Sequence, residues 1–148
     1  MRCSVHKTSL LLMLSAIALL AQVTSPFIGK WELNVAKSKF SPGPKPKTEM
    51  VTNMDGKTTI KGIDSDGKPF KWSFMPSEGA VVPIEGMDNS TVEEKISGKT
   101  LDHAWKIAGG NTHGHGVLSK DDKVLRYTEN GTDGQGRPLH NVFVFERQ

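Results

Sequence analysis

The feature that most constrains this chain is the regular return of turn residues between short segments of alternating polarity. Its 15 glycines all lie at position 29 or later and are spread along the chain. Between them apolar and polar residues alternate, as in 29–35, where Trp31, Leu33 and Val35 share one face. A period of two is typical of half-buried β-strands, and no later segment predicts a helix convincingly. The sequence therefore predicts about ten strands at roughly ten-residue spacing.

The connections between these segments favour a particular strand order. Asp55-Gly56 is a hairpin signal, whereas the segment 36–47 carries Pro42, Pro44 and Pro46 and predicts a long loop. Strands at this spacing are typical of a sandwich or an up-and-down barrel, and very short turns favour the meander. The expected strands are 29–35, 48–54, 58–63, 70–75, 81–84, 92–96, 101–107, 112–119, 124–128 and 139–146.

Closure of such a meander on itself removes the two exposed edges that an open sheet would leave. The predicted fold class is therefore all-β, an antiparallel up-and-down barrel of about 8–10 strands that is closed or nearly closed. The sequence shows no internal repeat and no second domain.

The first residues, Met1–Ala21, have the pattern of a secretory signal peptide. Arg2 and Lys7 precede an apolar run from Leu10 to Leu20, and small residues follow it. The run is about half of the ~20 residues that a membrane span requires, so we expect no stable membrane insertion after cleavage. The predicted organisation is a cleaved segment 1–21 and one domain over 22–148, in a secreted or periplasmic protein.

Cleavage changes what the composition implies about partners. Loss of Arg2 and Lys7 reduces the 19 basic residues to 17, against 16 acidic ones, so the net charge falls from +3 to +1. A nucleic-acid partner is therefore not expected. The only cysteine, Cys3, is also removed, which excludes disulfides, thiol catalysis and cysteine-bound zinc in the mature domain.

The opening of the first expected strand, Gly29-Lys30-Trp31, resembles the Gly-x-Trp motif of the lipocalins and the wider calycin superfamily. The longer string over 31–44 is similar to that of small secreted bacterial lipocalin-like proteins, and the resemblance covers roughly 27–148. It implies that Trp31 closes the narrow end of the barrel, that Arg147 stacks on it, and that Gly29 lets the chain pass close by. It also implies that the loop 36–47 lies beside the open end. The chain lacks the Thr-Asp-Tyr motif of classical lipocalins.

A lipocalin-like barrel would bind a small, largely hydrophobic molecule among inward-facing aromatic side chains. Such pockets carry a few polar groups, and Arg126 or His103 could supply a polar anchor. Small barrels are also often packed solid, so aromatic residues that simply fill the interior are an alternative. The candidate ligand-binding residues are Trp72, Phe74, His103, Trp105, Arg126, Tyr127, Phe143 and Phe145.

Three histidines are candidate metal ligands. A two-residue turn at Gly109-Gly110 would pair Lys106 with His113 and place His103 on the face opposite to His113 and His115, although a one-residue shift would reverse this. Because the three histidines would then lie on opposite faces of the sheet, exposed histidines are favoured over a metal site. Neither a metal nor another cofactor is therefore expected.

No nucleophile motif or recognisable carboxylate pair is present, so the sequence predicts a binding protein rather than an enzyme. Two alternatives remain. One is a solid-cored envelope or stress protein that acts through its surface. The other is an enzyme at the barrel mouth that acts on a small lipophilic substrate, and an inward-facing His103 beside a carboxylate would favour it. The identity of the ligand and the oligomeric state stay open.

Overall fold

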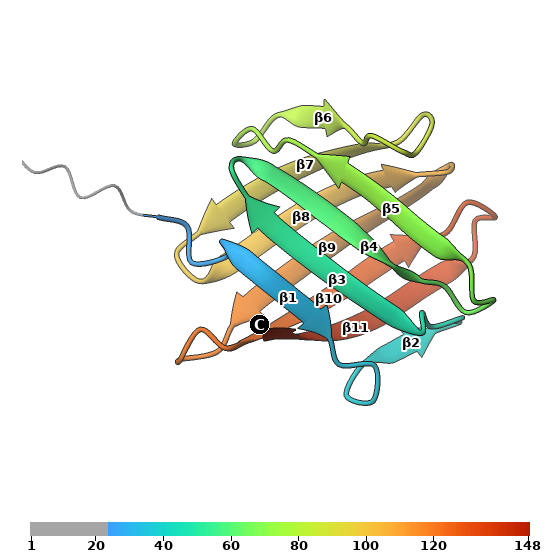
Figure 1. The fold of residues 1–148 in the computed structure, drawn as a ribbon. Helices are drawn as coiled ribbons and strands as arrows, with labels where there is room; N and C mark the ends of the chain where they lie inside the picture. Colours follow the sequence, from blue (N-terminus) through green and yellow to red (C-terminus); the bar gives the residue numbers. More distant parts are fainter. Residues whose placement is uncertain (1–23) are drawn as a thin grey trace, which may run out of the picture.

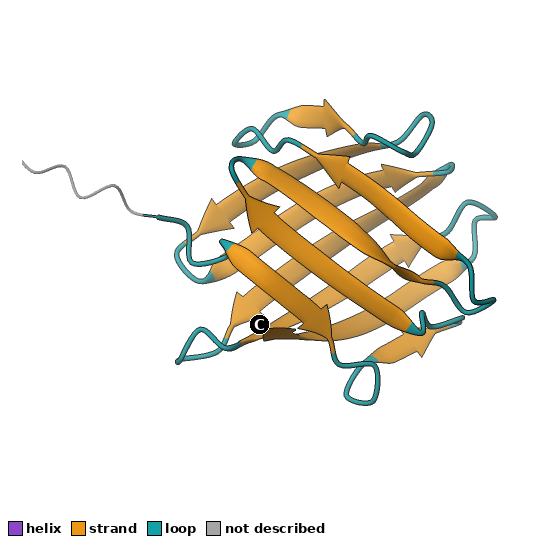
Figure 2. Ribbon diagram, viewed as in Figure 1, coloured by secondary structure: helices purple, strands orange, loops and turns teal. Residues whose placement is uncertain are grey.

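A computed structural model describes residues 24–148, which form strands, turns and loops without any helix (Figures 1 and 2). This part of the chain accordingly offers no helix that could cross a membrane. The predicted signal peptide, 1–21, lies outside the described residues and stays a prediction. The strands are β1 (Gly29–Leu33), β2 (Lys39–Ser41), β3 (Thr48–Met54), β4 (Lys57–Ile63), β5 (Pro69–Phe74), β6 (Val81–Pro83), β7 (Thr91–Ser97), β8 (Thr100–Ile107), β9 (Gly110–Leu118), β10 (Val124–Thr132) and β11 (Pro138–Arg147).

The strands form one antiparallel sheet that curls into a barrel. The order is β5-β4-β3-β1-β11-β10-β9-β8-β7-β6, so most neighbours in space are also neighbours in sequence. The barrel closes through a bridge between Ser73 of β5 and Glu85, two residues after β6, with N···O distances of 3.0 and 2.8 Å. The expected antiparallel up-and-down barrel, nearly closed, is therefore confirmed.

Two-residue turns fix the register of the hairpins. Asp55 and Gly56 both have positive φ, 54° and 72°, which matches the right-handed twist of the strands that they join. The β8–β9 turn is made by Ala108 and Gly109, with φ of 48° and 83°, and not by Gly109 and Gly110 as expected. Because the turn lies one residue earlier than expected, each residue of β9 pairs with a residue of β8 two positions from the expected one. His113 therefore pairs with Ala104 rather than with Lys106. Because the pairing changes by an even number of residues, His103 still lies on the face opposite to His113 and His115, as predicted.

The segment 36–47, predicted to be a loop throughout, contains a short strand, so that prediction was wrong in part. Strand β2 pairs with β11, with Phe40 opposite Asn141. It ends at Ser41, just before the first of the alternating prolines, so each of its residues keeps the N–H that a ladder needs. The Phe40 ring then packs edge-on against Phe143, 5.1 Å between centroids. The segment thus contributes to the barrel wall as well as to a loop.

Trp31 of β1 lies inside the barrel, and its side chain is almost fully buried. The Arg147 guanidinium carbon lies 4.1 Å from the Trp31 ring centroid, which is a cation–π contact. Arg147 also donates to the backbone carbonyls of Pro26, Ile28 and Asp122 at 2.6–2.7 Å. At Gly29, a Cβ would lie 3.0 Å from Arg147 Nη1. The stacking of Arg147 on Trp31 and the close approach at Gly29 are as the resemblance implies, and closure of the narrow end by Trp31 stays a prediction.

Candidate ligand cavity

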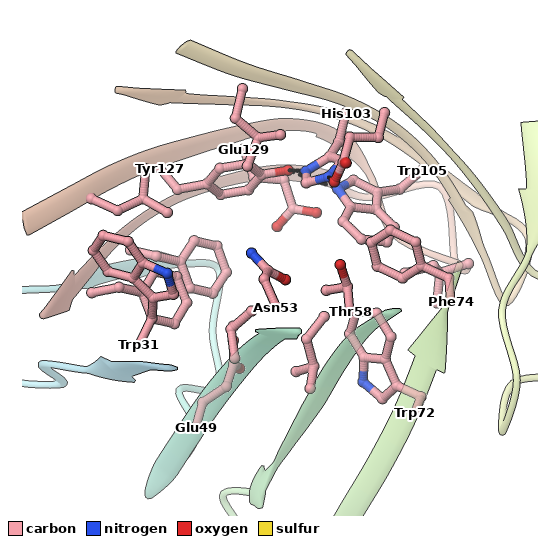
Figure 3. A pocket seen from close by; sticks show the side chains of 18 residues that line it. Trp31, Glu49, Asn53, Thr58, Trp72, Phe74, His103, Trp105, Tyr127 and Glu129 are labelled. Atoms are coloured by element: carbon pink, nitrogen blue, oxygen red, sulfur yellow. Dashed lines mark hydrogen bonds and ion pairs between the residues drawn. The ribbon is translucent and has the colours of Figure 1, made fainter. Parts of the chain in front are cut away.

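The barrel interior is only partly filled and keeps a cavity of about 190 Å³. Its lining comes from inward-facing positions of strands on all sides of the barrel (Figure 3). Seven of the eight predicted ligand-binding residues belong to it: Trp72, Phe74, His103, Trp105, Tyr127, Phe143 and Phe145. The alternative of an interior filled by these side chains therefore does not hold within the described residues.

Arg126 does not reach the cavity, and its predicted role as an inward polar anchor is wrong. It lies between Leu125 and Tyr127, which both point into the barrel, so the alternation of the strand turns Arg126 outward. Its neighbours across β9 and β11 are Val117 and Val144, and the Arg126 side chain is exposed.

Three aromatic rings in contact with one another form a wall on one side of the cavity. The Trp105 ring meets Trp72 and Phe74 edge-on, with centroid distances of 5.6 and 5.5 Å and interplanar angles of 88°. T-shaped contacts of this kind stabilise aromatic pairs beyond the burial of their area. The three rings thus pack against one another as well as against the cavity.

A chain of hydrogen bonds crosses this wall and ends at a carboxylate. Trp105 Nε1 donates to Tyr127 Oη at 2.7 Å, and His103 Nδ1 lies 3.1 Å from the same oxygen. His103 Nε2 lies 2.9 Å from Glu94 Oε2. An indole N–H can only donate, so the Tyr127 hydroxyl is free to donate its own proton to Nδ1, and Nε2–H then donates to Glu94. Burial raises the pKa of the Tyr127 hydroxyl, which stays protonated as this chain requires.

The position of Tyr127 depends on a glycine of the neighbouring strand. A Cβ at Gly114 would overlap the phenol oxygen and Cζ of Tyr127 and would lie 2.7 Å from its Cε1. From the sequence alone, Gly114 and Gly116 could mark a bend or bulge, or leave room for a bulky neighbour such as Trp105. The neighbour is instead Tyr127, because β9 pairs with β10 and sets Gly116 directly opposite Tyr127.

A second polar group in the cavity is centred on Glu129. Its two oxygens accept hydrogen bonds from Thr112 Oγ1 at 2.7 Å and from Asn141 Nδ2 at 3.1 Å. Glu49 lies near enough for the two charges to interact. Burial, and then the negative charge of Glu129, raise the pKa of Glu49 to about 7. Asn53 and Glu129 face the middle of the cavity from opposite walls (Figure 3).

The carboxylates of the cavity were not predicted from the sequence. The signal was present in the alternation: Glu94 lies between Val92 and Ile96, which share its face, and Glu129 follows Tyr127 at the next inward position. Glu49 likewise precedes the inward Val51. Charged residues are assigned to the outside by default because they are rarely buried, and this default hid them.

The two remaining histidines of the metal hypothesis lie on the outer face. His113 and His115 are exposed, and His115 Nδ1 lies 2.6 Å from Asp102 Oδ1. His103 points inward, as the parity argument predicted. Among residues 24–148, no group of three or more His, Cys, Asp or Glu side chains is placed to hold a metal ion.

Comparisons with known proteins find likeness only among solved structures. No family model and no curated protein matches the chain. The chain is similar to the wild-type fluorescent protein UnaG, at 15% identity over 82% of this chain and 97% of that one, with a TM-score of 0.48. A UnaG mutant in which one asparagine is replaced by alanine matches at 16% identity over 83% and 96% of the two chains, with a TM-score of 0.49.

Proposed function

We propose that the barrel binds one small, largely apolar organic molecule in its interior. The observation that supports this most directly is the cavity of about 190 Å³ with its aromatic wall. An engineered apolar cavity of about 150 Å³ is known to hold benzene, so this volume suits a ligand of one aromatic ring with a short substituent. It lies below the ~300–1,000 Å³ of pockets for larger ligands. Secretion stays a prediction from Met1–Ala21.

The three tryptophans of the chain all line the cavity, so intrinsic fluorescence reports its occupancy. We expect 2-phenylethanol to change the emission of the full chain and to raise its Tm, because a ligand that binds only the folded state stabilises it. Val51→Phe fills the cavity from β3 and should abolish both effects. Native mass spectrometry of the purified protein would show whether a molecule is already retained.

The matched control is Val117→Phe, which makes the same substitution at an outward position that is 44% exposed. This variant should respond to 2-phenylethanol as the original protein does. If no small probe of this size, neutral or charged, and no retained molecule is bound, or if Val51→Phe binds 2-phenylethanol as well as the original, ligand binding in this cavity is contradicted.

Catalysis in the same cavity is the second candidate, and the buried pair of His103 and Glu94 favours it. A histidine held by a carboxylate on one side and a protonated tyrosine on the other is arranged for proton transfer. The expected result is hydrolysis of 4-nitrophenyl acetate that His103→Gln reduces by about 10²-fold or more.

The outer surface offers a control for this test, because His115 and Asp102 form a similar pair in solvent. His115→Gln should leave the rate unchanged. Equal rates for the original protein and both variants would contradict catalysis through His103 on this ester.

A further inference from the structure

We propose that the ligand of the cavity is a small organic cation, a protonated amine carried on an apolar body of about one aromatic ring. This inference rests on the ligand-binding function proposed above and assigns the chemical class of the ligand. The sequence alone suggests a small, largely hydrophobic molecule and assigns it no charge.

The charges around the cavity are unbalanced. Three carboxylates, Glu49, Glu94 and Glu129, belong to the lining, and no Lys or Arg of the described residues does. Glu94 is paired with His103, but Glu129 is held by the neutral donors Thr112 and Asn141. Neutral donors keep a carboxylate in place and leave its charge in the cavity. Charges that are taken out of water are normally paired, so the cavity favours a positive occupant.

Unpartnered acceptors in the same cavity support this independently of the charge. Asn53 Oδ1 is fully buried and has no hydrogen-bond partner within residues 24–148. Over the same range, the Glu49 side chain makes no hydrogen bond or ion pair, and the neighbouring group that raises its pKa is the like charge of Glu129. Buried polar atoms without a partner are rare in folded proteins. An ammonium group carries three N–H donors and no acceptor, which complements a set of acceptors.

The aromatic wall supplies the rest of the recognition. The faces of Trp and Phe rings carry negative charge density and attract ammonium groups, by about 0.5–2 kcal/mol in general. Trp72 and Trp105 both line the cavity and stand at 88° to each other. An amine would thus find acceptors for its N–H groups and apolar walls for its ring in one cavity.

The test compares three probes of nearly equal size by isothermal titration of the full chain at pH 7.5. The probes are 2-phenylethylamine, 2-phenylethanol and 3-phenylpropionate, which are cationic, neutral and anionic. We expect the amine to bind about tenfold or more tightly than the alcohol, and the carboxylate to show no binding. Glu129→Gln should reduce amine affinity about tenfold and alcohol affinity by a much smaller factor, because the charge is lost and an acceptor oxygen is kept. Glu32→Gln, at an exposed position of β1, should change neither.

The outcomes separate this inference from the function on which it rests. Binding of the alcohol as tightly as the amine, or preference for the carboxylate, overturns the cationic ligand and leaves a ligand-binding barrel. Binding of no probe, together with no retained molecule, overturns both. The inference is also overturned if Glu129→Gln reduces the affinities for the amine and for the alcohol by the same factor. Glu49→Gln provides the second variant should Glu129→Gln fail to fold, and the same loss of amine preference is expected.

Discussion

Gly114→Ala is expected to destabilise the protein by about 3–5 kcal/mol, an unusually large effect for the addition of one methyl group. The added Cβ would overlap the Tyr127 phenol, so the ring must move. Movement of the ring breaks the hydrogen bonds of Tyr127 with Trp105 and His103, and each broken buried bond adds to the loss. Gly114 has no positive φ, so its backbone suits alanine and the effect is steric. Urea unfolding measures the difference.

Gly116→Ala is the matched control, because it lies on the same face of β9 two residues away. Its added Cβ would lie 3.0 Å from a methyl carbon of Leu125 and 3.1 Å from Tyr127 Cδ2, contacts that small shifts relieve. We expect a loss of about 1 kcal/mol or less. In a Tyr127→Ala background the cost of Gly114→Ala should also fall below about 1 kcal/mol, since the clashing ring is absent. Equal costs of Gly114→Ala in both backgrounds would contradict this explanation.

The expected class of barrel followed from the sequence because alternation and turn chemistry act locally. Asp55-Gly56 is sufficient to define its hairpin, and the alternation along 101–107 placed His103 and Trp105 inside. The register at β8–β9 was wrong by two residues because either Ala108-Gly109 or Gly109-Gly110 can form a two-residue turn. Only the pairing of whole strands decides between them.

The site was harder to predict because its polar groups are assembled across the barrel. Glu94 and His103 face each other across β7 and β8, and Tyr127 reaches His103 from β10 over the glycines of β9. No spacing along the chain encodes that meeting. Arg126 shows the converse: it was a candidate polar anchor because apolar pockets carry a few polar groups, and the alternation of the strand places it outside. Applied strictly, the same parity would have placed Glu94 and Glu129 inside.

Glu49→Gln is expected to stabilise the protein at pH 8 by about 1–3 kcal/mol and to have no effect near pH 4. The Glu49 pKa is about 7 in the folded state and 4.5 without the protein environment. The folded state therefore binds more protons between these values, and stability falls as the pH rises from about 4.5 to about 7. Glutamine carries no charge at any pH and removes this loss. Urea unfolding at pH 4, 6 and 8 gives the profile.

The control for this effect is Glu32→Gln, which removes a carboxylate from the exposed face of β1 and should leave the pH profile unchanged. A gain from Glu49→Gln that is equal at all three pH values would indicate better packing instead of a removed charge. Glu129→Gln should also lower the pKa of Glu49, because the charge of Glu129 helps to raise it. A carboxyl group that destabilises the empty fold above pH 7 contributes nothing to folding there. A bound cation that stabilises the Glu49 carboxylate would explain why this residue lies in the cavity. The titration with 2-phenylethylamine measures that interaction independently.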